Sequence, residues 1–135
     1  MKKQLIPKKK VWIPKEPIKA MFERQVSFQK RFHNLEIIIA GQTTMAKDTQ
    51  AYLDSMLTHM IQETCEAREW TKFKGWKTYP EKWTKEQRYE FLNELIDVQH
   101  FLINAAIGVD CDHKEFTRLY FNKQKVNIDR QEKGY

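Results

Sequence analysis

The sequence predicts an all-α protein, folded as an antiparallel four-helix bundle. Apolar residues recur at helical spacing over four long segments of the chain. Only four glycines and four prolines occur among 135 residues, and three of the prolines lie before residue 18, which argues against a turn-rich sandwich or barrel. A chain of this length suits one domain. We therefore expect one bundle of helices.

The first two helices are expected over residues 17–39 and 47–72. Pro17 suits the first turn of a helix, and Gly41 suits a stop after the first helix. The second segment carries apolar residues at the spacing of one helix face: Leu53, Met56, Leu57, Met60 and Ile61.

The third and fourth helices each begin at a recognisable cap. Thr84 and Gln87 fit a capping box, and the helix that follows is expected to end near Gly108. Asp112 suits the N-cap of a last helix, with Glu115 three residues on, that continues toward the end of the chain. The third helix has the most apolar stripe: Phe91, Leu92, Leu95, Ile96, Val98, Leu102 and Ile103.

Lysines concentrate in the first 19 residues. Of 24 basic and 18 acidic residues in the chain, residues 1–19 hold seven lysines and one acid, so the remainder is neutral. We expect a basic, Pro/Lys-rich arm over residues 1–19 and a folded domain over 20–135. The arm is either a solvated tail or a segment that binds polyanions. A nucleic-acid arm would need several aromatic side chains among the lysines, and only Trp12 is present.

Neither a membrane span nor a secretory signal is expected. The longest stretch without charged residues in the apolar middle of the chain is 98–109, shorter than the ~18 residues that cross a bilayer. The lysines near the start are not followed by an apolar block. Cys65 and Cys111 are too few for a disulfide framework. These features favour a cytoplasmic protein.

Two pairs of acids lie at the margins of the apolar stripes. Glu63 and Glu66 are neighbours on the second helix, and Glu94 and Asp97 are neighbours on the third. If these margins meet, four carboxylates converge and repel one another unless a cation neutralises them. Oxygen ligands alone suit Mg²⁺ first and Mn²⁺ second. The alternative is a solvated acidic face, because such pairs occur by chance in acid-rich helices.

The motifs resemble those of a known superfamily. Glu63-x-x-Glu66 followed by Glu94-x-x-Asp97 is similar to the metal-binding signature of the all-α NTP pyrophosphatases, which include MazG-like proteins, dimeric dUTPases and phage-type dCTPase/dUTPase enzymes. The Phe-Lys-Gly-Trp-Lys segment at 73–77 is similar to the basic loop of dimeric dUTPases. Residues 120–135 resemble their terminal Lys-Asn-x-x-Asn-x-x-Arg-Gln-x-x-Gly-Tyr motif.

The resemblance implies hydrolysis of a pyrimidine deoxynucleoside triphosphate to the monophosphate and pyrophosphate. The four acids would hold Mg²⁺, and Glu66 is our choice for the residue that orients or deprotonates the attacking water. Lys74 and Lys77 would contact phosphates. Relatives pair subunits to complete the core and the pocket, so a homodimer or larger homo-oligomer is implied. The phage-type likeness also suggests that a viral genome encodes the protein.

The terminal motif also has a physical rationale of its own. Lys123, Asn127 and Arg130 continue one face of the last helix, at the spacing i, i+4 and i+7. Such a face could bind phosphate through charge-assisted hydrogen bonds. The alternative is a frayed helix end whose basic residues favour the helix dipole.

Three residues are candidates for contacts with the base. Phe101 could stack on a pyrimidine, Asn104 could hydrogen-bond its edge, and Gln29 matches a glutamine that the family uses near the base. Their alternatives are core packing for Phe101, a buried and satisfied amide for Asn104, and a surface position for Gln29. We expect His59 and His100 to be structural.

Departures from the family pattern affect substrate choice. The Gln-x-x-Leu-Asn pattern near the first helix is replaced here by Gln-Lys-Arg-Phe-His at 29–33, which leaves uracil specificity open. We expect dUTP as the first substrate, with dCTP or activity on both close behind. An amide can pair with either base, so residue type alone does not choose between them. Two other functions remain: an inactive relative that binds nucleotides or a partner, and a helical nucleic-acid-binding protein that uses its basic arm.

Overall fold

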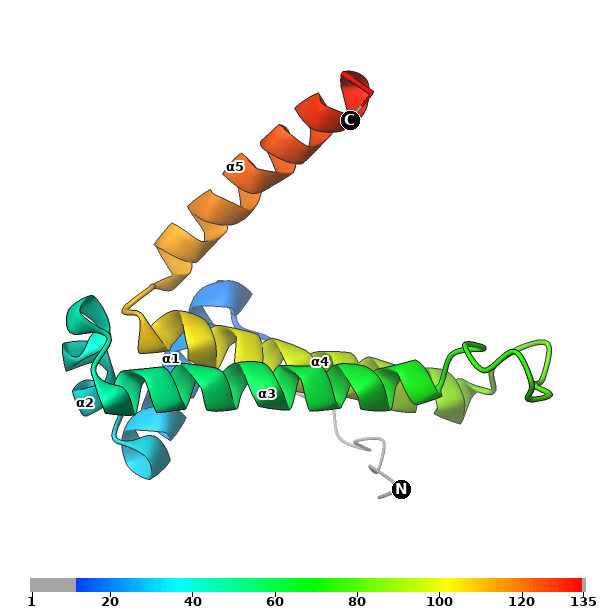
Figure 1. Cartoon of the computed structure of the whole chain (residues 1–135), viewed down its shortest axis with the longest axis horizontal. Coiled ribbons are helices and arrows are strands. Elements are labelled where there is room, and N and C mark those ends of the chain that lie inside the picture. The colour runs from blue at the N-terminus through cyan, green and yellow to red at the C-terminus, as the bar shows by residue number, and fades with distance from the viewer. Residues whose placement is uncertain (1–11, 135) are drawn as a thin grey trace.

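The computed structural model describes residues 12–134, and this part of the chain is helical, without a strand (Figure 1). The all-α prediction is confirmed. None of the described helices is long and apolar enough to cross a membrane. Residues 1–11 of the predicted arm lie outside the described residues. The helices are α1 (Pro17–His33), α2 (Leu35–Ala40), the 3-10 helix η1 (Gln42–Thr44), α3 (Lys47–Glu69), α4 (Lys85–Gly108) and α5 (His113–Glu132).

The predicted first helix is split in two at Asn34. This residue adopts a left-handed conformation, with φ 51° and ψ 46°, which ends α1 and starts α2. Asparagine tolerates this region better than most residues. After the break, α2 turns Leu35 and Ile38 into the core, where they are 0% and 6% exposed. The prediction of one helix over 17–39 was wrong because burial of these side chains requires a change of direction.

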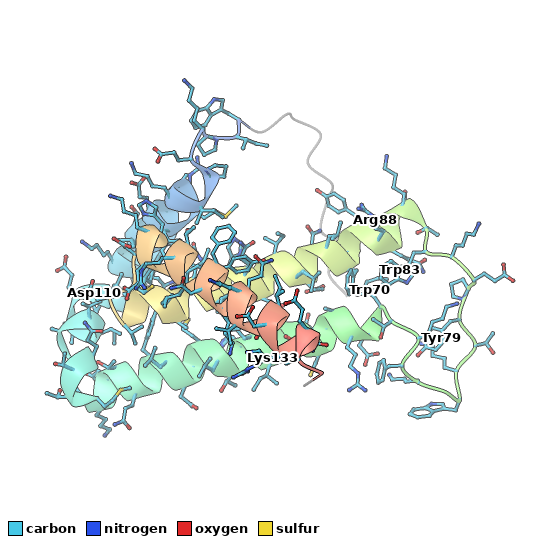
Figure 2. All side chains as sticks on the ribbon, turned by 90° about the horizontal axis from the view of Figure 1, so that it is seen from above. Trp70, Tyr79, Trp83, Arg88, Asp110 and Lys133 are labelled. Carbon is cyan, nitrogen blue, oxygen red and sulfur yellow. The ribbon has the colours of Figure 1, made fainter. Side chains whose placement is uncertain are left out.

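Helices α3 and α4 form an antiparallel hairpin (Figure 1). The predicted capping box is present at the start of α4: Gln87 N donates to Thr84 Oγ1 at 3.1 Å, and Thr84 N donates to Gln87 Oε1 at 2.9 Å. The loop over 70–84 projects beyond the ends of both helices (Figure 2). Its two ends are joined by Trp83 Nε1, which donates to the carbonyl of Trp70 at 2.9 Å.

The core contains two apolar clusters and a layer of polar side chains beside them. One cluster joins α1, α2 and α4, and the other joins α2 and α3: Phe22, Leu35, Ile103 and Ile107; Ile38, Tyr52 and Met56. The Tyr52 hydroxyl lies 2.9 Å from Gln29 Oε1 and 3.2 Å from the carbonyl oxygen of Asn104. Gln25 Nε2 donates to Asn104 Oδ1 at 3.1 Å. These bonds tie α1, α3 and α4 together.

Helix α5 begins as expected but does not join the body of the protein along its length. Asp112 Oδ1 accepts from Glu115 N at 2.8 Å, which confirms the predicted N-cap. Near its start Phe116 packs against Phe22 of α1, with ring centroids 5.4 Å apart. Beyond that point α5 diverges from α3 and α4 (Figure 1) and contains no buried residue. The four-helix bundle therefore stays a prediction.

The polar layer predicts the effect of a single hydroxyl on stability. We expect Tyr52→Phe to lower the free energy of unfolding by about 1–2 kcal/mol, because Gln29 Oε1 loses its donor inside the core. Urea unfolding would measure the change. Tyr120→Phe on exposed α5 is the matched control and should stay within about 0.5 kcal/mol of the parent. Equal stability of the Tyr52 variant and the control would contradict this role.

Candidate metal centre

Three of the four predicted carboxylates meet between α3 and α4. Glu63 of α3, Glu94 and Asp97 of α4 each offer an oxygen, and these oxygens all lie within 4.8 Å of one another. The three side chains are half-buried. Ala67, one turn beyond Glu63, is 4% exposed, so α3 remains packed at this level. The margins of the two apolar stripes therefore face each other, as the spacing predicted.

Glu66 flanks this cluster of Glu63, Glu94 and Asp97. The Glu66 side chain is exposed, and its Oε1 accepts a hydrogen bond from Gln62 Nε2 at 3.2 Å. Its charge nevertheless raises the pKa of Glu63 and of Glu94, so it lies within electrostatic reach of both. Glu66 thus borders the cluster and remains a predicted ligand.

Burial and mutual repulsion shift the protonation of the cluster. Burial raises the pKa of Glu94 to about 7, and the negative charges of Glu66, Glu63 and Asp97 add to the effect. Burial, followed by the charges of Glu66 and Asp97, also raises the pKa of Glu63. A hydrogen bond between Glu63 and Glu94 raises the pKa of Glu94 and lowers that of Glu63, so a proton shared by the pair favours Glu94.

The donor set of the cluster fits a hard divalent cation. All three converging groups are carboxylates, and the described chain brings no thiolate to the same group of ligands. Mg²⁺ and Mn²⁺ prefer such oxygen ligands. A cation between the carboxylates would replace the shared proton and remove the repulsion. The geometry therefore defines an all-α protein with a cluster of three carboxylates between two helices, whose oxygens fit a hard divalent cation.

Two histidines lie next to the acidic cluster. His100 Nδ1 is 3.4 Å from Asp97 Oδ1, one turn away on α4. His59 lies one turn before Glu63 on α3, and its Nδ1 is 2.7 Å from the carbonyl oxygen of Ser55. Its ring packs against Phe101 with centroids 5.0 Å apart.

The predicted phosphate contacts fall in two places. Lys74 and Lys77 lie in the loop after α3, where Lys74 Nζ pairs with Glu69 Oε2 at 2.9 Å and Lys77 Nζ lies 5.7 Å from the centre of the Tyr79 ring (Figure 2). The remaining three are exposed on the diverging part of α5, which the single chain does not bring to the carboxylates: Lys123, Asn127 and Arg130.

Two of the predicted base contacts are inside the core. Gln29 is 2% exposed and Asn104 is 4% exposed. Both accept a hydrogen bond from the Tyr52 hydroxyl, Gln29 through its side chain and Asn104 through its backbone carbonyl. The surface position considered for Gln29 is wrong, because its amide satisfies the buried Tyr52 hydroxyl. Phe101 is half-buried and packs against the cluster that contains Tyr52. Tyr52 and Gln25 were missed because nothing local distinguishes them from other residues of an amphipathic helix.

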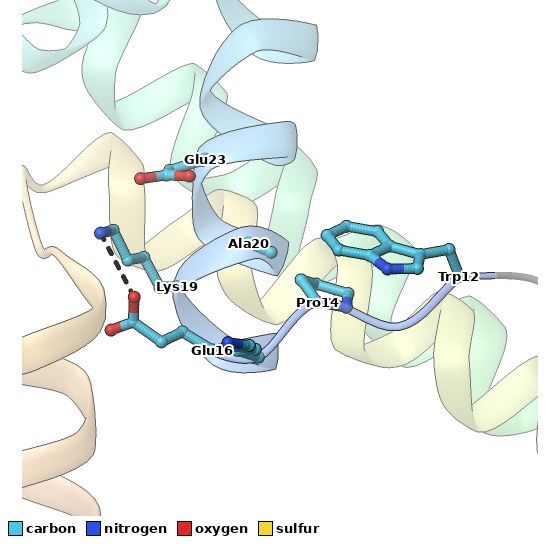
Figure 3. A pocket seen from close by; sticks show the side chains of 7 residues that line it. Trp12, Pro14, Glu16, Lys19, Ala20 and Glu23 are labelled. Atoms are coloured by element: carbon cyan, nitrogen blue, oxygen red, sulfur yellow. Dashed lines mark ion pairs between the residues drawn. The ribbon is translucent and has the colours of Figure 1, made fainter.

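A separate hollow lies at the start of α1. It measures about 340 Å³ and is lined by residues of the arm and of the first turns of that helix (Figure 3): Trp12, Pro14, Lys15, Glu16, Lys19, Ala20 and Glu23. Lys19 Nζ pairs with Glu16 Oε2 at 3.6 Å. None of the clustered carboxylates lines it.

A model of the dUTPase family matches residues 17–118, from the start of α1 into α5. The matched segment covers most of the chain and includes all four acids of the predicted signature. The chain therefore belongs to the dUTPase family. Lys123, Asn127 and Arg130 lie beyond the matched segment.

Two phage proteins resemble part of the chain. The dCTP pyrophosphatases of Enterobacteria phage T4 and Enterobacteria phage LZ5 are each 38% identical to it over 50 residues. Those residues are 37% of this chain and 29% of each phage protein, so the match spans less than a third of the relatives' length. No solved structure matches the chain significantly.

The raised pKa of Glu94 predicts a dependence of stability on pH. Its value of about 7 exceeds the ordinary 4.5, so the folded chain binds the proton more tightly than the unfolded chain. This contribution to stability is fully present below the ordinary pKa and is lost as the pH rises through about 7. We expect the melting temperature in EDTA to fall between about pH 5 and about pH 8.

Glu94→Gln should flatten this pH dependence and raise the melting temperature at the alkaline end, because it removes one of the repelling charges. Asp54→Asn, an exposed change on α3, is the control and should keep the parental slope. Thermal unfolding followed by circular dichroism measures both. A Glu94 variant with the parental slope would be inconsistent with a shared proton in the cluster.

Proposed function

We propose that the protein hydrolyses a pyrimidine deoxynucleoside triphosphate, dUTP or dCTP, to the monophosphate and pyrophosphate. The observation that carries the proposal is the convergence of Glu63, Glu94 and Asp97 between two helices of a dUTPase-family chain. The family is described as dUTPase and the two phage relatives are dCTP pyrophosphatases, so we propose both nucleotides as substrates.

The carboxylates would act by holding Mg²⁺, with Mn²⁺ as a substitute. Glu63, Glu94 and Asp97 would be direct ligands, and exposed Glu66 would complete the set or orient the attacking water. When bound, the cation supplies charge neutralisation of the phosphate oxygens and lowers the pKa of water. For this role Glu94 must be deprotonated, although without a cation its pKa is raised to about 7.

The loop lysines would hold the phosphates. Lys74 is bound to Glu69 in the structure, so phosphate binding requires exchange of one anionic partner for another. Lys77 lies in the same loop, which begins about one turn after Glu66. Both side chains would act as mobile point charges, which suits a triphosphate whose position changes as it is cleaved.

A homodimer or larger homo-oligomer is proposed from the exposed apolar side chains of the described helices. Large apolar side chains are exposed along three helices: Ile18, Met21, Phe28, Phe32, Leu92, Leu95, Ile96, Leu102, Leu119, Tyr120, Phe121, Val126 and Ile128. A second copy that packs on these faces would cover them. It would also bring the polar end of a neighbouring α5 to a carboxylate cluster.

The proposed reaction is tested by product analysis. Purified protein with Mg²⁺ should release pyrophosphate and the monophosphate from dUTP or dCTP, and little from purine dNTPs. Glu66→Gln should lower kcat at least about 100-fold while the circular dichroism spectrum stays unchanged, because the carboxylate supports the metal or the water. Asp54→Asn is again the control and should keep full activity.

Other products or a lack of turnover would favour different functions. A nucleoside diphosphate with inorganic phosphate would contradict the proposed bond cleavage. Nucleotide binding without hydrolysis would favour an inactive relative. Steeply salt-dependent DNA binding that disappears on deletion of residues 1–19 would favour a nucleic-acid-binding role. On our proposal the same deletion leaves hydrolysis intact.

The oligomer is tested by mass measurement in solution. Light scattering should give at least twice the 16.3 kDa of one chain. Phe121→Asp should shift the mass toward one chain, because it places a charge on an exposed apolar part of α5. Lys125→Asp, also on α5, is the control for a change of charge without loss of an apolar side chain. A parent of 16.3 kDa would refute the assembly.

A further inference from the structure

A pair of aromatic rings lies one helical turn from the carboxylate cluster, on the side away from the loop. His59 is four residues before Glu63 on α3, and Phe101 is four residues after Asp97 on α4. Because the helices are antiparallel, these two positions lie at the same level. The rings are in contact, with centroids 5.0 Å apart and planes inclined by 40°. We call this the His59–Phe101 pair.

The two rings differ in what they offer to a ligand. Phe101 is half-buried and packs against the cluster of Ile38, Tyr52 and Met56, so its place is fixed by the core. The His59 side chain is exposed, and its ring packs on the ring of Phe101. A histidine that served only the core would be expected beneath the surface.

The hydrogen bond to Ser55 fixes the chemistry of the His59 ring. Nδ1 lies 2.7 Å from the Ser55 carbonyl oxygen, which can only accept, so Nδ1 carries the hydrogen. In the neutral ring Nε2 is then the acceptor. Within residues 12–134 the structure gives Nε2 no hydrogen-bond partner. The exposed side of His59 therefore presents an acceptor whose direction is set by the helix.

The two ends of the α3–α4 interface carry different kinds of side chain. On one side of the carboxylates the loop carries Lys74 and Lys77, and on the other side lies the His59–Phe101 pair. A nucleoside triphosphate has the same polarity, with anionic phosphates at one end and a sugar and flat base at the other. Phosphates held between the cation and the loop would leave the nucleoside over His59.

We propose that His59 is a substrate-binding residue whose Nε2 accepts a hydrogen bond from the nucleoside part of the substrate. This assignment replaces the structural role expected for His59 from the sequence, and it rests on the proposed function. Because Nε2 accepts, the substrate must supply a hydrogen-bond donor. A deoxynucleotide has such donors at its 3′ hydroxyl and at the N–H groups of its base.

The matched variant is His59→Phe, which keeps a ring against Phe101 and removes Nε2. We expect KM to rise about tenfold with kcat within about twofold of the parent, since one hydrogen bond to bound substrate is lost. Binding of Mn²⁺ without nucleotide, followed by electron paramagnetic resonance, should be unchanged. His33→Phe, at an exposed position of α1, is the control and should leave KM unchanged.

Dideoxynucleotides separate the two donors. If the donor is the 3′ hydroxyl, His59→Phe raises KM for the deoxynucleotide but not for its 2′,3′-dideoxy analogue; if it lies on the base, KM rises for both. An unchanged KM for both substrates, or a rise accompanied by weaker Mn²⁺ binding or a lower melting temperature, overturns the proposal. A parent protein that hydrolyses neither dUTP nor dCTP contradicts the proposed function, which is a separate outcome.

Discussion

The packing of α3 against α4 forces like charges together, and the rest of the site depends on that constraint. Apolar burial along the hairpin sets the level at which Glu63 meets Glu94 and Asp97. Burial and their repulsion raise the pKa of Glu94 to about 7, so protonation of Glu94 relieves the repulsion as the pH falls. A cation can relieve it instead, because the same oxygens suit a hard metal ion. On our proposal, a cation would take the place of the proton between these oxygens.

Local signals in the sequence were sufficient to predict where α4 and α5 begin and that the acids of α3 and α4 face each other. The Thr84–Gln87 box and the Asp112 cap are made within one turn of chain, so residue type and spacing specify them. The acids follow from periodicity, because a position at the margin of an apolar stripe must lie beside the neighbouring helix. The break at Asn34 and the direction of α5 depend on contacts between distant segments, which spacing alone does not contain.

The buried polar side chains around Tyr52 show that function, like the path of the chain, depends on contacts that residue spacing does not contain. Gln29 and Asn104 carry the groups that a base would need, and in the structure their side chains accept from Tyr52 and Gln25, so a contact with a base stays a prediction. An amide suits either role, and only its neighbours decide. His59 illustrates the reverse case: its residue type suggested a structural role, whereas its exposure and the bond of its Nδ1 to Ser55 are the basis of the proposed substrate contact.

The three clustered acids come from one hairpin that is contiguous in the sequence, over 47–108. Their approach requires only that this one hairpin forms, so the site does not depend on bringing distant parts of the sequence together. A contiguous segment can also be exchanged between genomes in a single recombination event with every ligand in place. Such an exchange would also have to preserve the contacts of Phe22, Leu35 and Ile38 with the hairpin, because these residues complete its core.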